Sequence, residues 1–280
     1  MKHLVLTSLL AVPALAAAQR LPQPSPPGKV EQIIGLTTVQ VEYSRPSMKG
    51  RTIFGDLVPM GKVWRTGANQ CTLLRTDGMM MVEGQKLSAG TYSVLTVPGD
   101  ESWQVIFNRD TTLWGEDGYK EELNALVVKV MRGKNERPVE TFTIHFGDLK
   151  EDQATMFLSW ENITVPVVMQ ADSRAQAITN IQKAIEDPKA GFGTFHSSAR
   201  FCLDRGLMLK EALGWAQKSV TMEKKFWNLH TLAKLYAANG MYKEAIAAAE
   251  ESMKLSQEAA NEGYVKMNKE GIEKWAAMTK

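Results

Sequence analysis

The residues of this chain that could carry chemistry are concentrated between positions 43 and 69. This stretch reads YSRPSMKGRTIFGDLVPMGKVWRTGAN and mixes cations with aromatic rings and with turn-forming Pro and Gly. An arginine presents a planar fork of N–H donors that fits a carboxylate or a phosphate, and a tryptophan or tyrosine ring offers a large apolar face with a polar edge. We therefore expect a ligand site built on loops, which contains Tyr43, Arg45, Arg51, Trp64, Arg65 and Asn69.

Two further residues, Asn108 and Trp114, complete the expected site. Trp114 precedes a glycine in a predicted loop, so its ring would be open to a sugar or a peptide side chain. Asn108 could orient a ligand, and it could equally close a turn by binding its own backbone. For Arg65 two roles stay open: contact with a ligand, or a structural role in which the guanidinium binds loop carbonyls.

No complete signature for catalysis or for metal binding occurs in the sequence. There is no H-E-x-x-H motif and no paired-Cys spacing, so we expect no zinc site, and no Gly-rich phosphate cradle is present. A G-x-S-x-G elbow is also missing, although a Ser–His–Asp triad assembled from distant residues stays open. Glu140 and Glu161 could serve as glycosidase carboxylates, but nothing singles out a pair. We expect no cofactor, and the balance is against an enzyme.

The stretch 43–69 also resembles the opening signature of a bacterial family, the domain of unknown function 2911. The likeness continues through EGQKLSAGTYSVLTVPG (83–99), WQVIFN (103–108) and LWG (113–115), and covers about residues 26–169. The resemblance implies no particular activity. It implies a tyrosine at the position of Met60 and an acidic residue at the position of Gln70, so a site that requires a carboxylate at position 70 would be altered in this chain.

The N-terminal 18 residues have the pattern of a secretion signal. Lys2 and His3 precede an apolar run over residues 4–15, and three alanines then form a small-residue cleavage site before Gln19. The run is shorter than the roughly 20 apolar residues that span a bilayer, so we expect export to the periplasm or the medium and no transmembrane segment. The formal net charge of +2 lacks the basic footprint of a nucleic-acid-binding protein.

Hydrophobic periodicity divides the remaining chain into two predicted domains. After a Pro-rich lead-in at 19–29, apolar residues alternate with polar ones over 30–170, in nine or ten short segments that include separate strands at 155–160 and 164–169. Such segments with intervening turns are typical of an antiparallel β-sandwich or barrel. From residue 171 the period changes to that of a helix. The predicted fold is therefore α+β, with a helical repeat-like domain at 171–280.

An internal repeat occurs within the predicted helices. KEALGWAQKS (210–219) matches KEAIAAAEES (243–252) at an offset of 33 residues. The second copy resembles a tetratricopeptide repeat, a helical hairpin with a period of about 34 residues. The resemblance implies helical hairpins that contact a partner protein.

Two functions remain in competition. The first is a binding or scaffold protein of the cell envelope, in which the β-domain binds a small anionic ligand, a glycan or a peptide and the helices hold a protein partner. The second is a secreted hydrolase that acts on envelope polymers or glycans. Two carboxylates that face each other across the site would favour the hydrolase. A cationic, aromatic site without an acid–base pair would favour binding.

Overall fold

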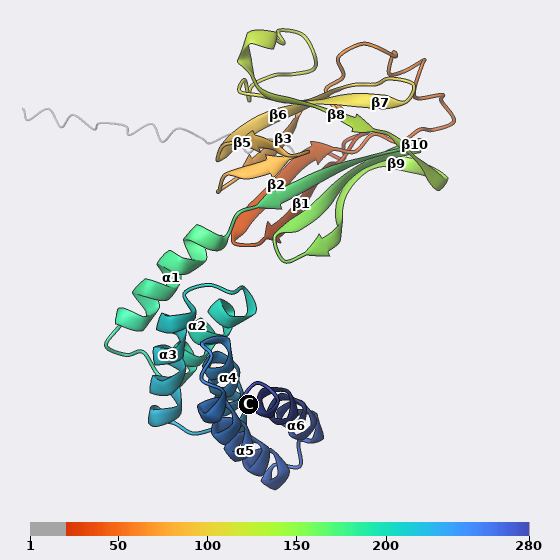
Figure 1. Cartoon of the computed structure of the whole chain (residues 1–280). Coiled ribbons are helices and arrows are strands. Elements are labelled where there is room, and N and C mark those ends of the chain that lie inside the picture. Colours follow the sequence, from red (N-terminus) through yellow and green to blue (C-terminus); the bar gives the residue numbers. More distant parts are fainter. Residues whose placement is uncertain (1–20, 280) are drawn as a thin grey trace, which may run out of the picture. The chain divides into compact units, whose positions relative to one another are not determined.

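The computed structural model describes residues 21–279, and these form two units that divide after Ser173 (Figure 1). The first unit consists of β-strands and the second of α-helices, as the change of period predicts. The α+β architecture is thus confirmed. The expected secretion signal, residues 1–18, lies outside the described part of the chain.

The β-unit contains two antiparallel sheets. The six-stranded sheet has the order β1-β2-β3-β6-β7-β8, and the four-stranded sheet has the order β5-β4-β10-β9. The strands are β1 (Pro27–Ile34), β2 (Thr37–Ser44), β3 (Thr72–Thr76), β4 (Met80–Val82), β5 (Gln85–Leu87), β6 (Gly90–Val97), β7 (Ser102–Asn108), β8 (Asn124–Met131), β9 (Gly133–Lys150) and β10 (Gln153–Ala171). Each sheet is open among the described residues, so of the two predicted architectures the structure has the sandwich and not the closed barrel.

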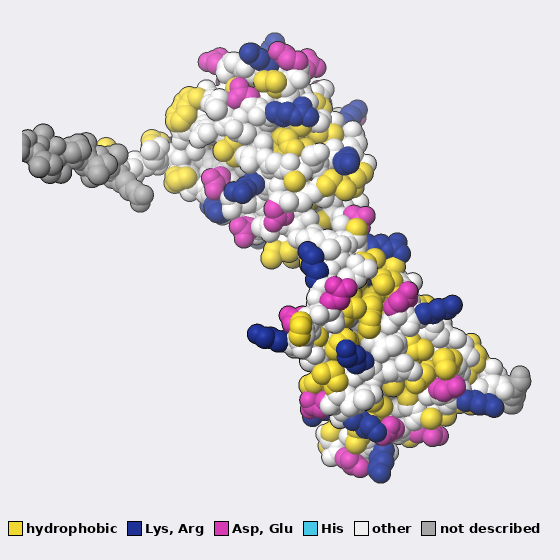
Figure 2. All heavy atoms as spheres, turned by 90° about the vertical axis from the view of Figure 1, so that its left-hand side faces the viewer, with side chains coloured by type: hydrophobic (Ala, Val, Ile, Leu, Met, Phe, Trp, Pro, Cys, Tyr) yellow, Lys and Arg dark blue, Asp and Glu magenta, His cyan; other side chains and the backbone are white. Residues whose placement is uncertain are grey.

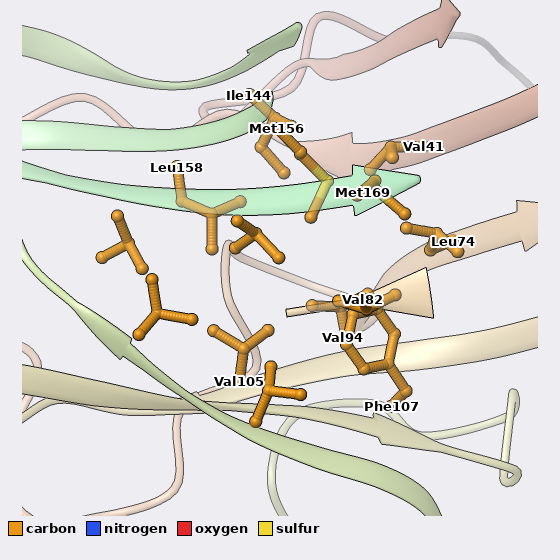
Figure 3. Packing of buried hydrophobic residues seen from close by; sticks show 14 of the residues in the cluster. Val41, Leu74, Val82, Val94, Val105, Phe107, Ile144, Met156, Leu158 and Met169 are labelled. Atoms are coloured by element: carbon orange, nitrogen blue, oxygen red, sulfur yellow. The ribbon is translucent and has the colours of Figure 1, made fainter. Parts of the chain in front are cut away.

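The core of the β-unit lies between the two sheets. In β2 the side chains of Val39, Val41 and Tyr43 are buried on one face, because successive side chains of a strand point to opposite faces. Figure 3 shows side chains of the six-stranded sheet, such as Val105, directed toward Leu158 and others of the four-stranded sheet. An aromatic group continues this core and consists of Phe54, Trp64, Trp103, Phe142 and Trp160.

The strand boundaries differ from the predicted ones at two places. β1 begins at Pro27, inside the range 19–29 that we expected to be a lead-in, because Pro27 pairs with Ser44 of β2. The segments 155–160 and 164–169 form one strand, β10, and not two. The register of β10 against β9 shifts on both sides of Glu161, which has a positive φ of 51°. A β-bulge lets a strand bend without ending, and local periodicity does not reveal that continuity.

The helical unit consists of α1 (Arg174–Glu186), α2 (Phe192–Asp204), α3 (Leu209–Met222), α4 (Phe226–Ala238), α5 (Tyr242–Glu258) and α6 (Glu262–Ala276). Equivalent hydrogen bonds occur at matching positions of its internal sequence repeat. Ser219 of α3 donates to the carbonyl of Phe192 at 2.9 Å, and Ser252 of α5 donates to the carbonyl of Phe226 at 2.7 Å. Each serine joins the two helices of one hairpin, and the two serines are separated by the offset of the sequence repeat.

Small residues form much of the contact surface between these helices. Ala199, Ala212, Ala233 and Ala245 are fully buried, so neighbouring helix backbones can approach closely. On the face of the molecule that Figure 2 shows, Lys and Arg side chains are interspersed with Asp and Glu. Among the described residues, no helix is long and apolar enough to cross a membrane.

Candidate functional site

The site is organised by the turn at residues 66–69, Thr66-Gly67-Ala68-Asn69, which we call the TGAN turn. Thr66 and Asn69 both have positive φ values, 55° and 59°, although neither is a glycine. Such conformations are costly and persist only where surrounding contacts hold them, often at functional sites. The buried Thr66 is held in this way: its carbonyl accepts a hydrogen bond from Thr72 Oγ1 at 2.5 Å, and its hydroxyl donates to Thr96 Oγ1 at 3.1 Å.

The TGAN turn is also packed against the end of β2. Gly67 has a φ of 151°, and a Cβ at this position would lie 3.0 Å from the carbonyl oxygen of Ser44. The Nδ2 group of Asn69 donates to the hydroxyl of Ser44 at 3.3 Å. Position 67 therefore favours glycine, because a side chain would be strained at this φ and would crowd the Ser44 carbonyl of β2.

A groove of about 400 Å³ lies beside the turn, where β1, β2 and the start of β3 meet. Its polar lining comes from side chains on the face of β2 opposite the core and from their neighbours: Lys29, Glu42, Ser44 and Gln70. Lys29 Nζ lies 3.8 Å from Glu42 Oε1, as expected from the pairing of these residues across β1 and β2. The groove therefore presents hydrogen-bond donors and acceptors together, with little net charge.

The loop at residues 109–120, which we call the Trp114 loop, flanks the groove. Asn108 is fully buried at its base. The Nδ2 group of Asn108 donates to the carbonyl of Lys120 at 2.9 Å and to Asn124 Oδ1 at 2.8 Å. Its Oδ1 accepts from the backbone N–H of Asp110 at 2.9 Å. Asn108 thus closes the loop at both ends.

The tip of the Trp114 loop is bound to residues that follow the TGAN turn. The backbone N–H of Cys71 donates to the carbonyl of Leu113 at 3.1 Å, and Cys71 Sγ donates to the carbonyl of Gly115 at 3.0 Å. Both neighbours of Trp114 are therefore held by Cys71, which lines the groove. The Trp114 side chain between them is 69% exposed, so the loop presents a large exposed aromatic ring between two residues that a member of the groove wall holds.

Of the eight residues that the sequence proposes for the site, Tyr43 lines the groove itself. Four others lie in the Trp114 loop, at its base, in the TGAN turn or in contact with both: Arg65, Asn69, Asn108 and Trp114. Arg65 forms an ion pair with Glu116 of the loop. Trp64 instead belongs to the aromatic core, since it is 7% exposed and its Nε1 donates to the carbonyl of Gly67 at 3.2 Å.

The side chains of Tyr43, Arg45 and Arg51 are held by structural contacts. The hydroxyl of Tyr43 donates to the carbonyl of Ile144 and accepts from its N–H. Arg45 donates to Phe142 O at 3.2 Å and to Thr143 Oγ1 at 2.8 Å. Arg51 donates to Met48 O at 2.9 Å and to Ser47 O at 2.6 Å. The guanidinium groups of Arg45, Arg51 and Arg65 thus each bind a different set of partners.

Sequence reasoning did not select Lys29, Glu42, Ser44 or Cys71, although all four line the groove. A signal for Glu42 and Ser44 was available, because they are the polar positions that alternate with the buried Val41 and Tyr43. Nothing local marks Lys29, whose place depends on the pairing of β1 with β2.

Burial raises the pKa of the Cys71 thiol to about 11. A cysteine nucleophile acts as a thiolate, so Cys71 is in the unreactive form at neutral pH. Cys71 and Cys202 are both buried and unpaired.

In the Trp114 loop, hydrogen bonds from the side chain and backbone of Thr112 lower the pKa of Asp110. Among residues 21–279, no group of three His, Cys, Asp or Glu side chains is placed to hold a metal ion.

Comparison with known sequences identifies residues 25–169 with the family described as Protein of unknown function (DUF2911). The matched segment is more than half of the chain. The chain belongs to this family. The match includes the groove, the TGAN turn and the Trp114 loop, and it ends in β10, so the helical unit lies outside it. No curated protein and no solved structure matches the chain.

Proposed function

We propose that this member of the family is an exported binding protein of the cell envelope. The β-unit takes a small polar ligand in the groove beside the TGAN turn, and the helical unit contacts a partner protein. The observation that carries the proposal is the position of Trp114. Its ring is exposed, yet the carbonyl on each side of it is bound by Cys71, a residue of the groove wall. Binding sites use rigidly held aromatic rings because little conformational entropy is lost on contact.

Of the three ligand classes that the sequence leaves open, a short saccharide has the most support. A small anion would require free cations, whereas the arginines of residues 43–69 bind carbonyls, a hydroxyl or Glu116. The groove offers an amide at Gln70, a hydroxyl at Ser44 and the Lys29–Glu42 pair. Such mixed donors and acceptors suit sugar hydroxyls, which both donate and accept, and an exposed indole face suits the apolar face of a sugar ring.

The competing function, a secreted hydrolase, has less support. Glycosidases of the common type place two carboxyl groups on opposite sides of the scissile bond. Among the described residues that line the groove, Glu42 is the single carboxylate, and it is paired with Lys29. The high pKa of Cys71 also disfavours a thiolate nucleophile at this site.

The saccharide proposal is tested by titrating the protein with soluble oligosaccharides of N-acetylglucosamine and with disaccharide fragments of peptidoglycan, followed by calorimetry. We expect saturable binding that Trp114→Ala weakens roughly two- to tenfold, the contribution of one aromatic contact. Met131→Ala is the matched control, because Met131 is another large exposed apolar residue of the β-unit, on β8 and outside the groove. Absence of saturable binding by every saccharide, or equal weakening by the two variants, would overturn the proposal.

Export is tested separately, by fractionating cells that express the whole chain and determining the N-terminus of the protein outside the cytoplasm. Cleavage before Gln19 is expected from the small-residue pattern at 16–18. An intact Met1 on protein recovered outside the cytoplasm, or recovery in the cytoplasm alone, contradicts cleavable export and leaves the ligand proposal unaffected.

A further inference from the structure

The helical unit contains a second cavity, of about 510 Å³. Its walls come from the end of α2, from α4, from the start of α5 and from α6 with the residues after it. The volume falls within the range of about 300–1,000 Å³ that is typical of small-molecule sites. Apolar side chains make most of the wall, including Leu203, Tyr242, Met267, Trp275 and Met278.

The apolar floor depends on a glycine in α6. A Cβ at Gly271 would lie 2.9 Å from the Trp275 ring, so the ring lies against the helix backbone one turn earlier. Trp275 is buried with the helical core, whereas Met267 and Met278 are exposed at the cavity. Methionine side chains are flexible and adapt to the shape of an apolar ligand.

The polar part of the cavity has an excess of positive charge. Lys234 of α4 and Lys274 of α6 both line it, and neither forms an ion pair with another described residue. Glu270 is the one carboxylate among the described lining residues. Two lysines and one glutamate leave a formal charge of +1, which matches one monovalent anion.

His230 adds a polar group to the same cavity and no charge at neutral pH. Asn268 Nδ2 donates to Ser252 Oγ at 2.7 Å, so Asn268 Oδ1 accepts from His230 Nδ1, at 2.7 Å. The neutral ring then carries its proton on Nδ1. Burial lowers the pKa of His230, and nearby Lys234 acts in the same direction.

We propose that this cavity binds a small amphipathic carboxylate, such as a medium-chain fatty acid. The apolar chain lies on the floor formed by Trp275 and the methionines, and the carboxylate contacts Lys234 and Lys274. The site is separate from the groove of the β-unit and lies in the part of the chain outside the family match. It is therefore a second binding activity, which does not depend on the saccharide proposal.

The test is calorimetric titration of the whole protein with decanoate, decanol and decylamine. These probes share one apolar chain and differ in the charge of the head group. We expect decanoate to bind about tenfold more tightly than decanol, the scale of a hydrogen bond to a charged group, and decylamine to bind most weakly. Equal affinity for decanoate and decanol, or no binding of decanoate, would overturn the proposal.

Substitutions locate the site. Lys234→Gln and Lys274→Gln are each expected to weaken decanoate binding about tenfold and to leave decanol binding unchanged. Lys269→Gln is the matched control, because Lys269 is an exposed lysine of α6 that does not line the cavity. Gly271→Ala displaces the Trp275 ring and should weaken the binding of both decanoate and decanol. Equal effects of the three lysine variants would contradict the site.

One further titration separates a free fatty acid from a segment of a protein. An acidic peptide with apolar side chains carries the same chemistry as decanoate on a larger body. Tighter binding of such a peptide than of decanoate, with the same dependence on Lys234 and Lys274, would overturn the small-molecule assignment. We expect the peptide to bind more weakly than decanoate.

Discussion

Arg65 and Glu116 form an ion pair, with Nη2 and Oε2 3.2 Å apart, which joins the residue before the TGAN turn to the Trp114 loop. The same guanidinium donates from Nη1 to the carbonyl of Asn69 at 3.4 Å. It also lies against Gly115, where a Cβ would be 3.2 Å from Nη1. These contacts indicate that Arg65 positions the residues beside the groove, which is the structural one of the two roles left open by the sequence.

Arg65→Lys should therefore weaken saccharide binding several-fold while leaving the fold intact. Lysine can retain the ion pair with Glu116 but lacks the planar fork that also reaches Asn69. The side chains of this pair are 31% and 47% exposed, so the loss of unfolding free energy should stay below about 1 kcal/mol. Calorimetric titration and thermal denaturation measure the two effects. Arg51→Lys is the control, because it removes a guanidinium group outside the groove, and it should leave the affinity for saccharide unchanged. If Arg65→Lys also leaves that affinity unchanged, the positioning role of Arg65 is contradicted.

Gly67→Ala should destabilise the β-unit by about 1–3 kcal/mol. A side chain at this φ is strained, and the new methyl group meets the Ser44 carbonyl oxygen at 3.0 Å. Gly50→Ala is the matched control, because its φ is also positive at 75° and nothing lies within 4 Å of the added Cβ. Urea denaturation of both variants separates backbone strain from the contact with β2. A loss in Gly67→Ala no larger than in Gly50→Ala would show that the contact is unimportant.

Cys71 should make stability fall as the pH rises from 9 to 11. Its folded pKa is about 11 against an ordinary value of 9.0. The unfolded chain therefore releases this proton first, and its ionisation favours unfolding over that window. Between about pH 8 and pH 10.5 the unfolding free energy should fall in both proteins, but the fall should be smaller in Cys71→Ala than in the unaltered protein. The difference between the two falls should be on the order of 2 kcal/mol. Urea denaturation at the two pH values measures this difference, and equal losses would refute a buried, protonated thiol.

Local periodicity was sufficient to predict the two kinds of structure and the change between them near residue 171. It also indicated a helical domain from residue 171 onward, because each helix carries its own apolar face. The offset of 33 residues between the two KEA segments likewise predicted helical hairpins, and Ser219 and Ser252 form equivalent bonds between helices at that same offset. The family was identifiable for a similar reason, since its motifs are continuous in the chain.

What the sequence by itself determined is thus the order of the elements, the family of the β-unit and the region of the turn beside the groove. Only the tertiary structure decided what each side chain contacts. Arg45 binds Thr143, 98 positions away, and Trp64 lies against Trp160 in the core, so neither faces the groove. Lys29 reaches it only through the register of β1 on β2. The physical reason is that strand pairing joins distant residues, whereas periodicity reports only the local face of each strand.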